Sequence, residues 1–285
     1  MLGAGIDAAA QCGAQGVEVI TNAFWASSFD QAARTVNKLR RRGVTDFIVS
    51  TDKYHQRFIG LDHVLHLVSA CNAASVRIRV QVSGKRESPF VAELLRLLER
   101  AHFSLLIQPV IPFGRGKKLI GETKAPSHAS QPGYCLSTES AIVFPDGNVY
   151  GCCGPASNFP KPHNLHLGNL RNDSLMTLLD RAYTNPFLTL LRLTGPEMAA
   201  AVLKKRAGLE WANPGLEWPC HFCQKFPLER AEWHDAAQSA IEDNAWRTKQ
   251  MMVRLLLHKK LLGTVMLSSM GNPPALPEDS QSLTV

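Results

Sequence analysis

The chain has 285 residues, a net charge of +7 and 45% hydrophobic residues, a composition that excludes wholesale disorder. A chain of this length ordinarily holds about two domains of roughly 150 residues. No apolar run approaches the roughly 18 residues that a membrane-spanning helix needs, and the first residues lack the basic segment of a signal peptide. We therefore expect a cytoplasmic protein with no membrane contact.

The positive charge is scattered along the chain rather than gathered in one segment. Its runs are short, as at 40–42, 204–206 and 259–260. Runs of this length are typical of solvated helix faces. The sequence therefore does not favour nucleic acid as a partner.

The first 120 residues alternate between short apolar runs and amphipathic stretches, which predicts strands and helices in turn. We expect strands at 17–22, 46–50, 76–82 and 105–110, the first of them buried. We expect helices at 8–14, from Ser27 or Ser28 to Gly43, through 58–68, and from Ser88 onward. This alternation predicts right-handed crossovers and a parallel α/β sheet. Four strands are few for a complete barrel.

Beyond residue 120 the sequence predicts a different organisation. Two apolar runs, 141–144 and 149–150, flank Pro145-Asp146-Gly147-Asn148, the signature of a β-hairpin turn. Helices are expected at 175–183, at 197–207 after Gly195-Pro196, and over a long stretch from about 229 to 262. We divide the chain into an α/β domain (1–120), a small α+β domain (121–235), a C-terminal helix (236–265) and a flexible tail (266–285).

Seven cysteines, an odd number in a long chain, argue against a disulfide framework. Cys220 and Cys223 form a C-x2-C pair, the spacing that lets two thiolates bind one metal centre. Cys135 lies before the predicted hairpin and Cys152 directly after it, in the spacing C-x11-G-x4-C. Because a hairpin folds its two ends together, all four thiols can converge. Such a set suits either zinc or an iron–sulfur cluster.

The other three cysteines are interpreted differently. Cys12 and Cys71 lie on the apolar sides of predicted helices, so we expect both to be buried core residues. Cys153 follows Cys152 directly, and either of these two neighbours can be the ligand.

These residues resemble the later part of a radical S-adenosylmethionine (SAM) enzyme with a SPASM or shorter "twitch" extension. Residues 19–23 are similar to the family strand that ends in Thr-Asn-Gly, 48–52 to the strand that ends in Ser-x-Asp, and 108–115 to the sixth-strand segment. The opening C-x11-G-x4-C, the later C-x2-C, and Leu167-Gly168-Asn169-Leu170 followed by a helix and Asn185-Pro186 are typical of the extension. The resemblance covers residues 8–230.

The resemblance implies a partial (βα) barrel of parallel strands, followed by a domain that binds an auxiliary [4Fe–4S] cluster on Cys135, Cys152, Cys220 and Cys223. It implies cofactor-binding roles for the residues near strand ends: Thr21, Asn22, Ser50, Asp52 and Arg115. Helix capping is an equal alternative for Ser50 and Asp52. His55 offers an acid–base group or a structural hydrogen bond.

The sequence also departs from the family. It contains neither the C-x3-C-x2-C loop that holds the SAM-cleaving cluster nor the Gly-Gly-Glu-Pro segment. Either the sequence is a truncated form of an enzyme, which we favour, or it is a protein that has lost SAM cleavage. We expect SAM to bind only if the missing N-terminal part is supplied.

We therefore expect an iron–sulfur protein of the radical SAM/SPASM class. Its expected partners are a peptide, protein or small-molecule substrate and an electron donor. The alternative is a non-catalytic binding protein in which zinc holds the four cysteines for a purely structural purpose.

Overall fold

The computed structural model describes residues 2–108, 110, 115–120, 135–152, 155–158, 163–207, 220, 223 and 231–252. The chain forms two compact units, one built on residues 1–110 and the other on residues 111–261. Each unit has its own hydrophobic core. The two units are therefore described separately.

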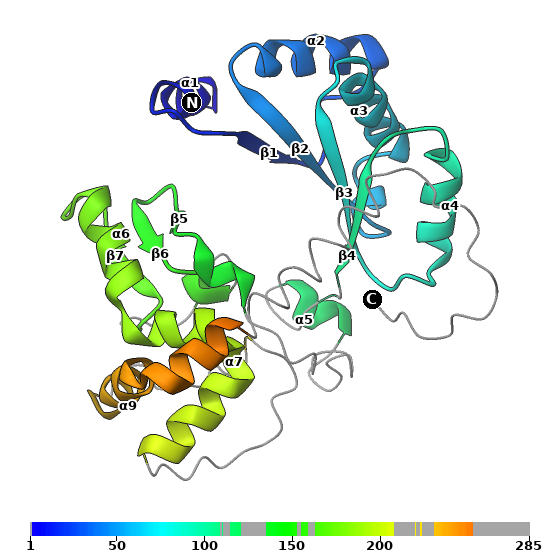
Figure 1. Ribbon diagram of the computed structural model, residues 1–285. Coiled ribbons are helices and arrows are strands. Elements are labelled where there is room, and N and C mark those ends of the chain that lie inside the picture. Colours follow the sequence, from blue (N-terminus) through cyan, green and yellow to red (C-terminus); the bar gives the residue numbers. More distant parts are fainter. Residues whose placement is uncertain are drawn as a thin grey trace. The chain divides into compact units, whose positions relative to one another are not determined.

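The first unit is a parallel α/β layer. Its elements are α1 (Leu2–Gln11), β1 (Val17–Thr21), α2 (Phe29–Arg40), β2 (Val44–Thr51), α3 (Leu61–Ala73), β3 (Arg77–Ser83), α4 (Pro89–Leu97) and β4 (Ser104–Gln108). The sheet order is β1-β2-β3-β4, and all neighbouring pairs are parallel. Because every crossover steps to the next strand in the same direction, right-handed connections place α2, α3 and α4 on one face of the sheet, as Figure 1 shows. The parallel α/β domain is confirmed, whereas its membership of a barrel stays a prediction.

The helix starts follow the capping residues that the sequence predicted. The Ser28 hydroxyl accepts a hydrogen bond from the backbone N–H of Gln31, and Ser88 accepts one from Val91, both at 3.3 Å. Pro89 opens α4 at a position where no backbone donor is needed. Gly43, just after α2, has a φ of 111°, a conformation that favours glycine.

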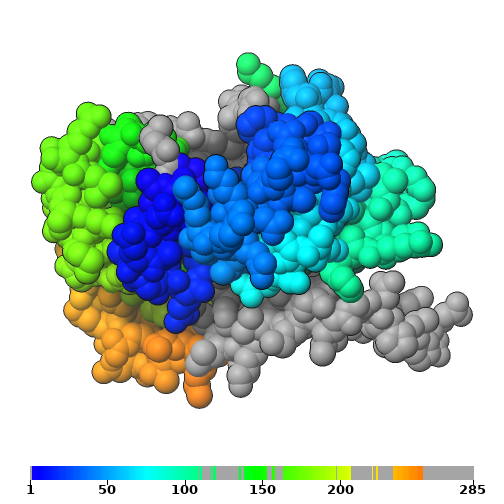
Figure 2. All heavy atoms as spheres, turned by 90° about the horizontal axis from the view of Figure 1, so that it is seen from above, coloured from blue at the N-terminus to red at the C-terminus, as the bar shows by residue number. Residues whose placement is uncertain are grey.

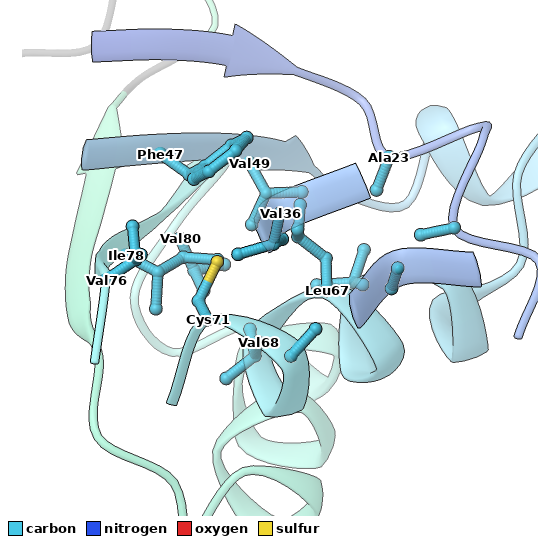
Figure 3. Packing of buried hydrophobic residues seen from close by; sticks show 14 of the residues in the cluster. Ala23, Val36, Phe47, Val49, Leu67, Val68, Cys71, Val76, Ile78 and Val80 are labelled. Atoms are coloured by element: carbon cyan, nitrogen blue, oxygen red, sulfur yellow. The ribbon is translucent and has the colours of Figure 1, made fainter. Parts of the chain in front are cut away.

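The core of this unit lies between the sheet and the helices. Phe47 and Val49 from β2 and Val80 from β3 pack against Val36 of α2 and Leu67 of α3 (Figure 3). Cys71 of α3 belongs to the same cluster and is fully buried, as expected. The corresponding expectation for Cys12 is wrong, because Cys12 follows the last turn of α1 and is exposed.

Strand β1 differs from the fully buried strand that its apolar sequence predicted. It pairs only with β2 and therefore forms one edge of the sheet. Val17 and Val19 pack against the core, but Ile20, on the opposite face, is 67% exposed. Alternation along a strand places successive side chains on opposite faces, so a continuous apolar run does not require two covered faces.

The basic run 40–42 lies at the end of α2 and is exposed, as expected for a solvated helix face. Figure 2 shows the atoms of α2 in blue on the surface that faces the viewer. Arg42 lies 3.6 Å from Asp7 of α1, an ion pair between two exposed side chains. Such a pair contributes at most about 1 kcal/mol.

The second unit carries a three-stranded antiparallel sheet and helices (Figure 1). The strands are β5 (Ile142–Val143), β6 (Asn148–Tyr150) and β7 (His166–Asn169), and the longer helices are α6 (Leu175–Thr184), α7 (Pro186–Ala207) and α9 (Ala231–Glu242). The predicted hairpin joins β5 and β6, and Gly147 in its turn has a φ of 84°. The sequence analysis did not assign β7, which pairs with β6.

Two helical regions differ in part from the prediction. Helix α7 consists of two helices that meet at a non-helical kink at Gly195 (φ 74°). The second of them is the helix predicted after Gly195-Pro196, whereas the first, which begins at Pro186, was not predicted. The expected continuous helix from 229 to 262 is interrupted at Asp243, whose carboxylate accepts a hydrogen bond from the Trp246 N–H at 3.0 Å. Asp243 thus caps a second helical segment, 244–252, while 253–262 and the predicted tail lie outside the described residues.

Within the described part of the chain, no helix combines the length and the apolar character needed to span a bilayer. This finding agrees with the hydropathy of the sequence.

Ser75 offers a test of the backbone geometry at the end of α3. It has a φ of 54° and is exposed, while the N–H of Val76 donates to the carbonyl of Cys71 at 2.9 Å, the pattern of a glycine-type helix end. Ser75→Gly should raise the free energy of unfolding by about 0.5–1 kcal/mol in urea titrations. Ser69→Gly, at an exposed position inside α3, should instead lower it by about 0.5 kcal/mol.

The reactivity of Cys71 offers a second test. Burial raises the pKa of the Cys71 thiol to about 12, so almost none of it is thiolate at pH 8. Iodoacetamide should alkylate Cys71 at least about 100-fold more slowly than the exposed Cys12 in the folded chain, as quantified by peptide mass mapping. In denaturant the two rates should become similar. Equal rates in the folded chain would contradict the placement of Cys71 in the core.

Candidate metal centre

The hairpin brings two of the predicted ligands to its base. Cys135 directly precedes the short 3-10 turn η3 (Leu136–Glu139), and its carbonyl accepts hydrogen bonds from the Thr138 N–H at 3.3 Å and hydroxyl at 2.8 Å. Cys152 lies two residues after β6, where the Gly151 N–H donates to the carbonyl of Leu165 at 2.8 Å. Backbone hydrogen bonds therefore position both cysteines.

The C-x2-C pair forms the other half of the site. Cys220 and Cys223 both have helical backbone conformation. Cys220 is half-buried, whereas Cys223 is buried.

The thiols of Cys135, Cys152 and Cys220 each act on the charge of Cys223. Burial raises the pKa of Cys223 well above its ordinary value, and the charges of Cys135, Cys220 and Cys152 raise it further. Such an effect requires the three other sulfurs to lie near that of Cys223, although Cys135 and Cys223 are far apart in sequence. Cys153, the alternative to Cys152, lies outside the described residues.

The cysteines lie in the hydrophobic core of the second unit. Cys152 and Cys223, each 8% exposed, belong to the cluster that contains Leu165, Phe187 and Leu188. A metal centre at this place is therefore shielded from water. Low exposure is one of the levers that set the reduction potential of an iron–sulfur cluster.

The sequence analysis missed an aromatic stack next to Cys152. The Tyr150 ring lies 5.8 Å from that of His163 in a stacked arrangement and 5.1 Å from that of His166, measured between ring centroids. His163 is buried at 6% exposure. The spacing of these residues carries no recognisable motif, because the stack forms only when β7 pairs with β6.

The chemistry of this donor set fits a metal centre. Four neighbouring thiolates repel one another in an apolar environment, so all four ionise together only if a cation shares the site. In a mononuclear zinc site, sulfurs about 2.3 Å from the metal lie only about 3.8 Å apart. Among the described residues, no three His, Cys, Asp or Glu side chains are grouped closely enough to hold a metal ion.

The other predicted binding residues lie at the carboxyl ends of β1 and β2 but face different sides of the sheet. Thr21 is in register with Val49 on the helix-covered face, and its hydroxyl accepts hydrogen bonds from the Trp25 indole at 3.1 Å and the Ala23 N–H at 3.0 Å. Ser50, which is in register with Gln81, lies on the opposite face. Asn22 is exposed, and its side chain accepts a bond from the Phe24 N–H at 3.3 Å.

Asp52 and Arg115 complete the predicted set. The buried Asp52 carboxylate caps the 3-10 turn η1 (His55–Arg57), accepting hydrogen bonds from the Tyr54 N–H at 2.8 Å and the His55 N–H at 2.9 Å. Arg115 opens α5 (Arg115–Ile120), and its side chain lies outside the described residues. Cofactor contacts of these five residues stay predictions.

Comparison with known proteins finds a family match within the second unit. Residues 135–200 match the family of the SPASM iron–sulfur cluster-binding domain, a range that includes Cys135 and Cys152 and ends before Cys220. No curated protein matches the chain. The match agrees with the hairpin, the buried thiols and the electrostatic contact among the four cysteines described above. Residues 135–200 of the chain therefore carry a SPASM-type iron–sulfur cluster-binding domain.

Proposed function

We propose that Cys135, Cys152, Cys220 and Cys223 together hold one [4Fe–4S] cluster. The observation that supports this proposal is the electrostatic contact of Cys223 with the other three sulfurs inside an apolar core. Four thiolates and a cationic centre neutralise much of each other's charge, so the cluster stabilises the fold as it binds.

The number of ligands points to the role of the centre. When bound, a cluster of this kind supplies one-electron transfer at a potential set by its surroundings. Four cysteines complete the ligation of four irons and leave no iron open for a substrate. We infer that the protein contributes electron transfer or support of a nearby site, while the buried Cys152 and Cys223 exclude water.

We propose that this centre acts as the auxiliary cluster in SAM-dependent radical chemistry on a peptide, protein or small-molecule substrate, with an electron donor as a further partner. The SAM-cleaving cluster needs three cysteines in C-x3-C-x2-C spacing, and the sequence contains no such spacing. That cluster must therefore be supplied by residues outside this sequence.

Metal analysis tests the first proposal. Anaerobic reconstitution of the full chain with iron and sulfide should give a brown protein with a broad visible absorption band and about four irons per chain. The cluster should compete successfully against added zinc. A colourless protein with about one zinc per chain, and no iron uptake, would contradict the cluster proposal and support a structural zinc site.

Single serine substitutions test the ligand set. Replacing any one of Cys135, Cys152, Cys220 and Cys223 should reduce the iron content to less than about half, because the cluster loses one of its four cysteine ligands. Cys12→Ser is the matched control, since Cys12 is exposed and belongs to the first unit, and it should leave iron content unchanged.

Cys153→Ser resolves which of the two neighbours is the ligand. We expect full iron content in this variant and loss in Cys152→Ser. Loss of iron in Cys153→Ser and full iron content in Cys152→Ser would make Cys153 the ligand. Full iron content in both variants would show that neither cysteine is a ligand.

A further inference from the structure

The loop after β2 holds an aspartate and a histidine together at the carboxyl edge of the parallel sheet. Asp52 directly follows Thr51, the last residue of β2, and His55 opens the 3-10 turn η1. The Nδ1 atom of His55 lies 3.0 Å from Oδ2 of Asp52, within ion-pair distance. This buried nitrogen makes no hydrogen bond among the described residues, so its contact with Oδ2 rests on distance alone.

The two oxygens of Asp52 have separate tasks. Oδ1 accepts both backbone hydrogen bonds of the turn, from Tyr54 and His55, so it provides the whole cap by itself. Oδ2 lies next to the imidazole. The carboxylate is 3% exposed and is held by two backbone donors, which fixes its orientation. Capping therefore explains Oδ1 but leaves the contact of Oδ2 with the imidazole unexplained.

The rest of the loop is rigid. The Gln56 amide donates to the buried Thr51 hydroxyl at 3.0 Å, and the N–H groups of Phe58 and Ile59 both donate to the His55 carbonyl, at 2.9 and 3.0 Å. These bonds hold the imidazole in place without using its ring nitrogens. The histidine is thus prepositioned before any ligand arrives.

Part of the His55 side chain is open to solvent. The side chain is 38% exposed although its Nδ1 is buried. Ligands of open parallel sheets bind beyond the carboxyl ends of the strands, which is where this loop lies. Phe24 and Phe58, on the loops that follow β1 and β2, are 66% and 84% exposed and add apolar surface along the same edge.

Two other histidines show what a purely structural contact looks like in this unit. Nδ1 of His63 lies 3.2 Å from the carbonyl of Ala23, and Nδ1 of His66 lies 3.0 Å from that of Ala26. Both rings tie α3 to the loop that follows β1. His55 makes no such link between elements, and its partner is a carboxylate.

We propose that Asp52 and His55 form a proton-transfer pair for a substrate with an ionisable O–H or N–H group and an apolar part. The neutral imidazole carries its proton on Nδ1, the ring atom next to Oδ2 of Asp52, and Nε2 accepts the proton of the substrate. Nε2 then releases this proton to water. Asp52 is a positioning residue that selects the tautomer of His55.

Asp52→Asn provides a sharp test because the turn orients the new amide. The two backbone N–H groups require the amide oxygen, so the NH2 group must face His55 and donate to Nδ1. The imidazole is then forced to carry its proton on Nε2, where it can no longer accept one. The cap is retained, so the fold should be preserved.

The experiment uses the full chain without reconstitution. Long-range ¹H–¹⁵N spectra should show neutral His55 protonated on Nδ1 in the wild type and on Nε2 in Asp52→Asn. Diethyl pyrocarbonate should modify His55 at least about tenfold more slowly in the variant. His63 and His66 should react at the same rate in both proteins, which controls for the fold.

Several outcomes would overturn the proposal. These are a wild-type His55 protonated on Nε2, a His55 that diethyl pyrocarbonate does not reach, or an equal rate in the variant. If Asp52→Asn does not fold, the tautomer of His55 in the wild type and its reactivity with diethyl pyrocarbonate still test the proposal. The proposal concerns only the first unit, so its outcome is independent of the iron content of the second.

Discussion

In the second unit the sulfur of Cys223 lies in an apolar core, with three other thiols near enough to oppose its ionisation. This constraint governs the unit. A core that only had to be stable would place aliphatic side chains there, because buried thiols that repel one another add nothing to stability. A bound cationic centre reverses the balance, since it favours the thiolate form of every ligand. The folding of this unit and the binding of its cluster should therefore be coupled.

The architecture of the unit serves that convergence. The hairpin of β5 and β6 lies between Cys135 and Cys152, which both act on the charge of Cys223, and the pairing of β6 with β7 adds the stacked rings of Tyr150 and His163. Helices α7 and α9 enclose the same cluster of buried side chains. Bringing Cys220 and Cys223 to this place closes a long loop, whose entropic cost grows only slowly with its length. A few local turns thus suffice to assemble a site from distant parts of the chain.

The first unit is organised differently, around a parallel sheet. Its strands are parallel and their crossovers all lie on one side, so one face of the sheet forms the core and the carboxyl ends carry polar loops. The loop after β2 is held by backbone bonds to Asp52 and His55, and that after β1 by contacts with Thr21. Rigid loops at this edge are where an α/β sheet can bind and orient a ligand.

The local features could be predicted from the amino-acid sequence: the four parallel strands, the caps at Ser28 and Ser88, the Gly147 turn and the four cysteines with their spacing. Each follows from residues close together in the chain, where periodicity and turn chemistry act directly. Three other features depend on packing between distant residues: Ile20 is exposed at a sheet edge, Cys12 is exposed while Cys71 is buried, and the Asp52 oxygens lie next to a turn and an imidazole. These outcomes depend on which surfaces meet, and a one-dimensional pattern does not contain that information.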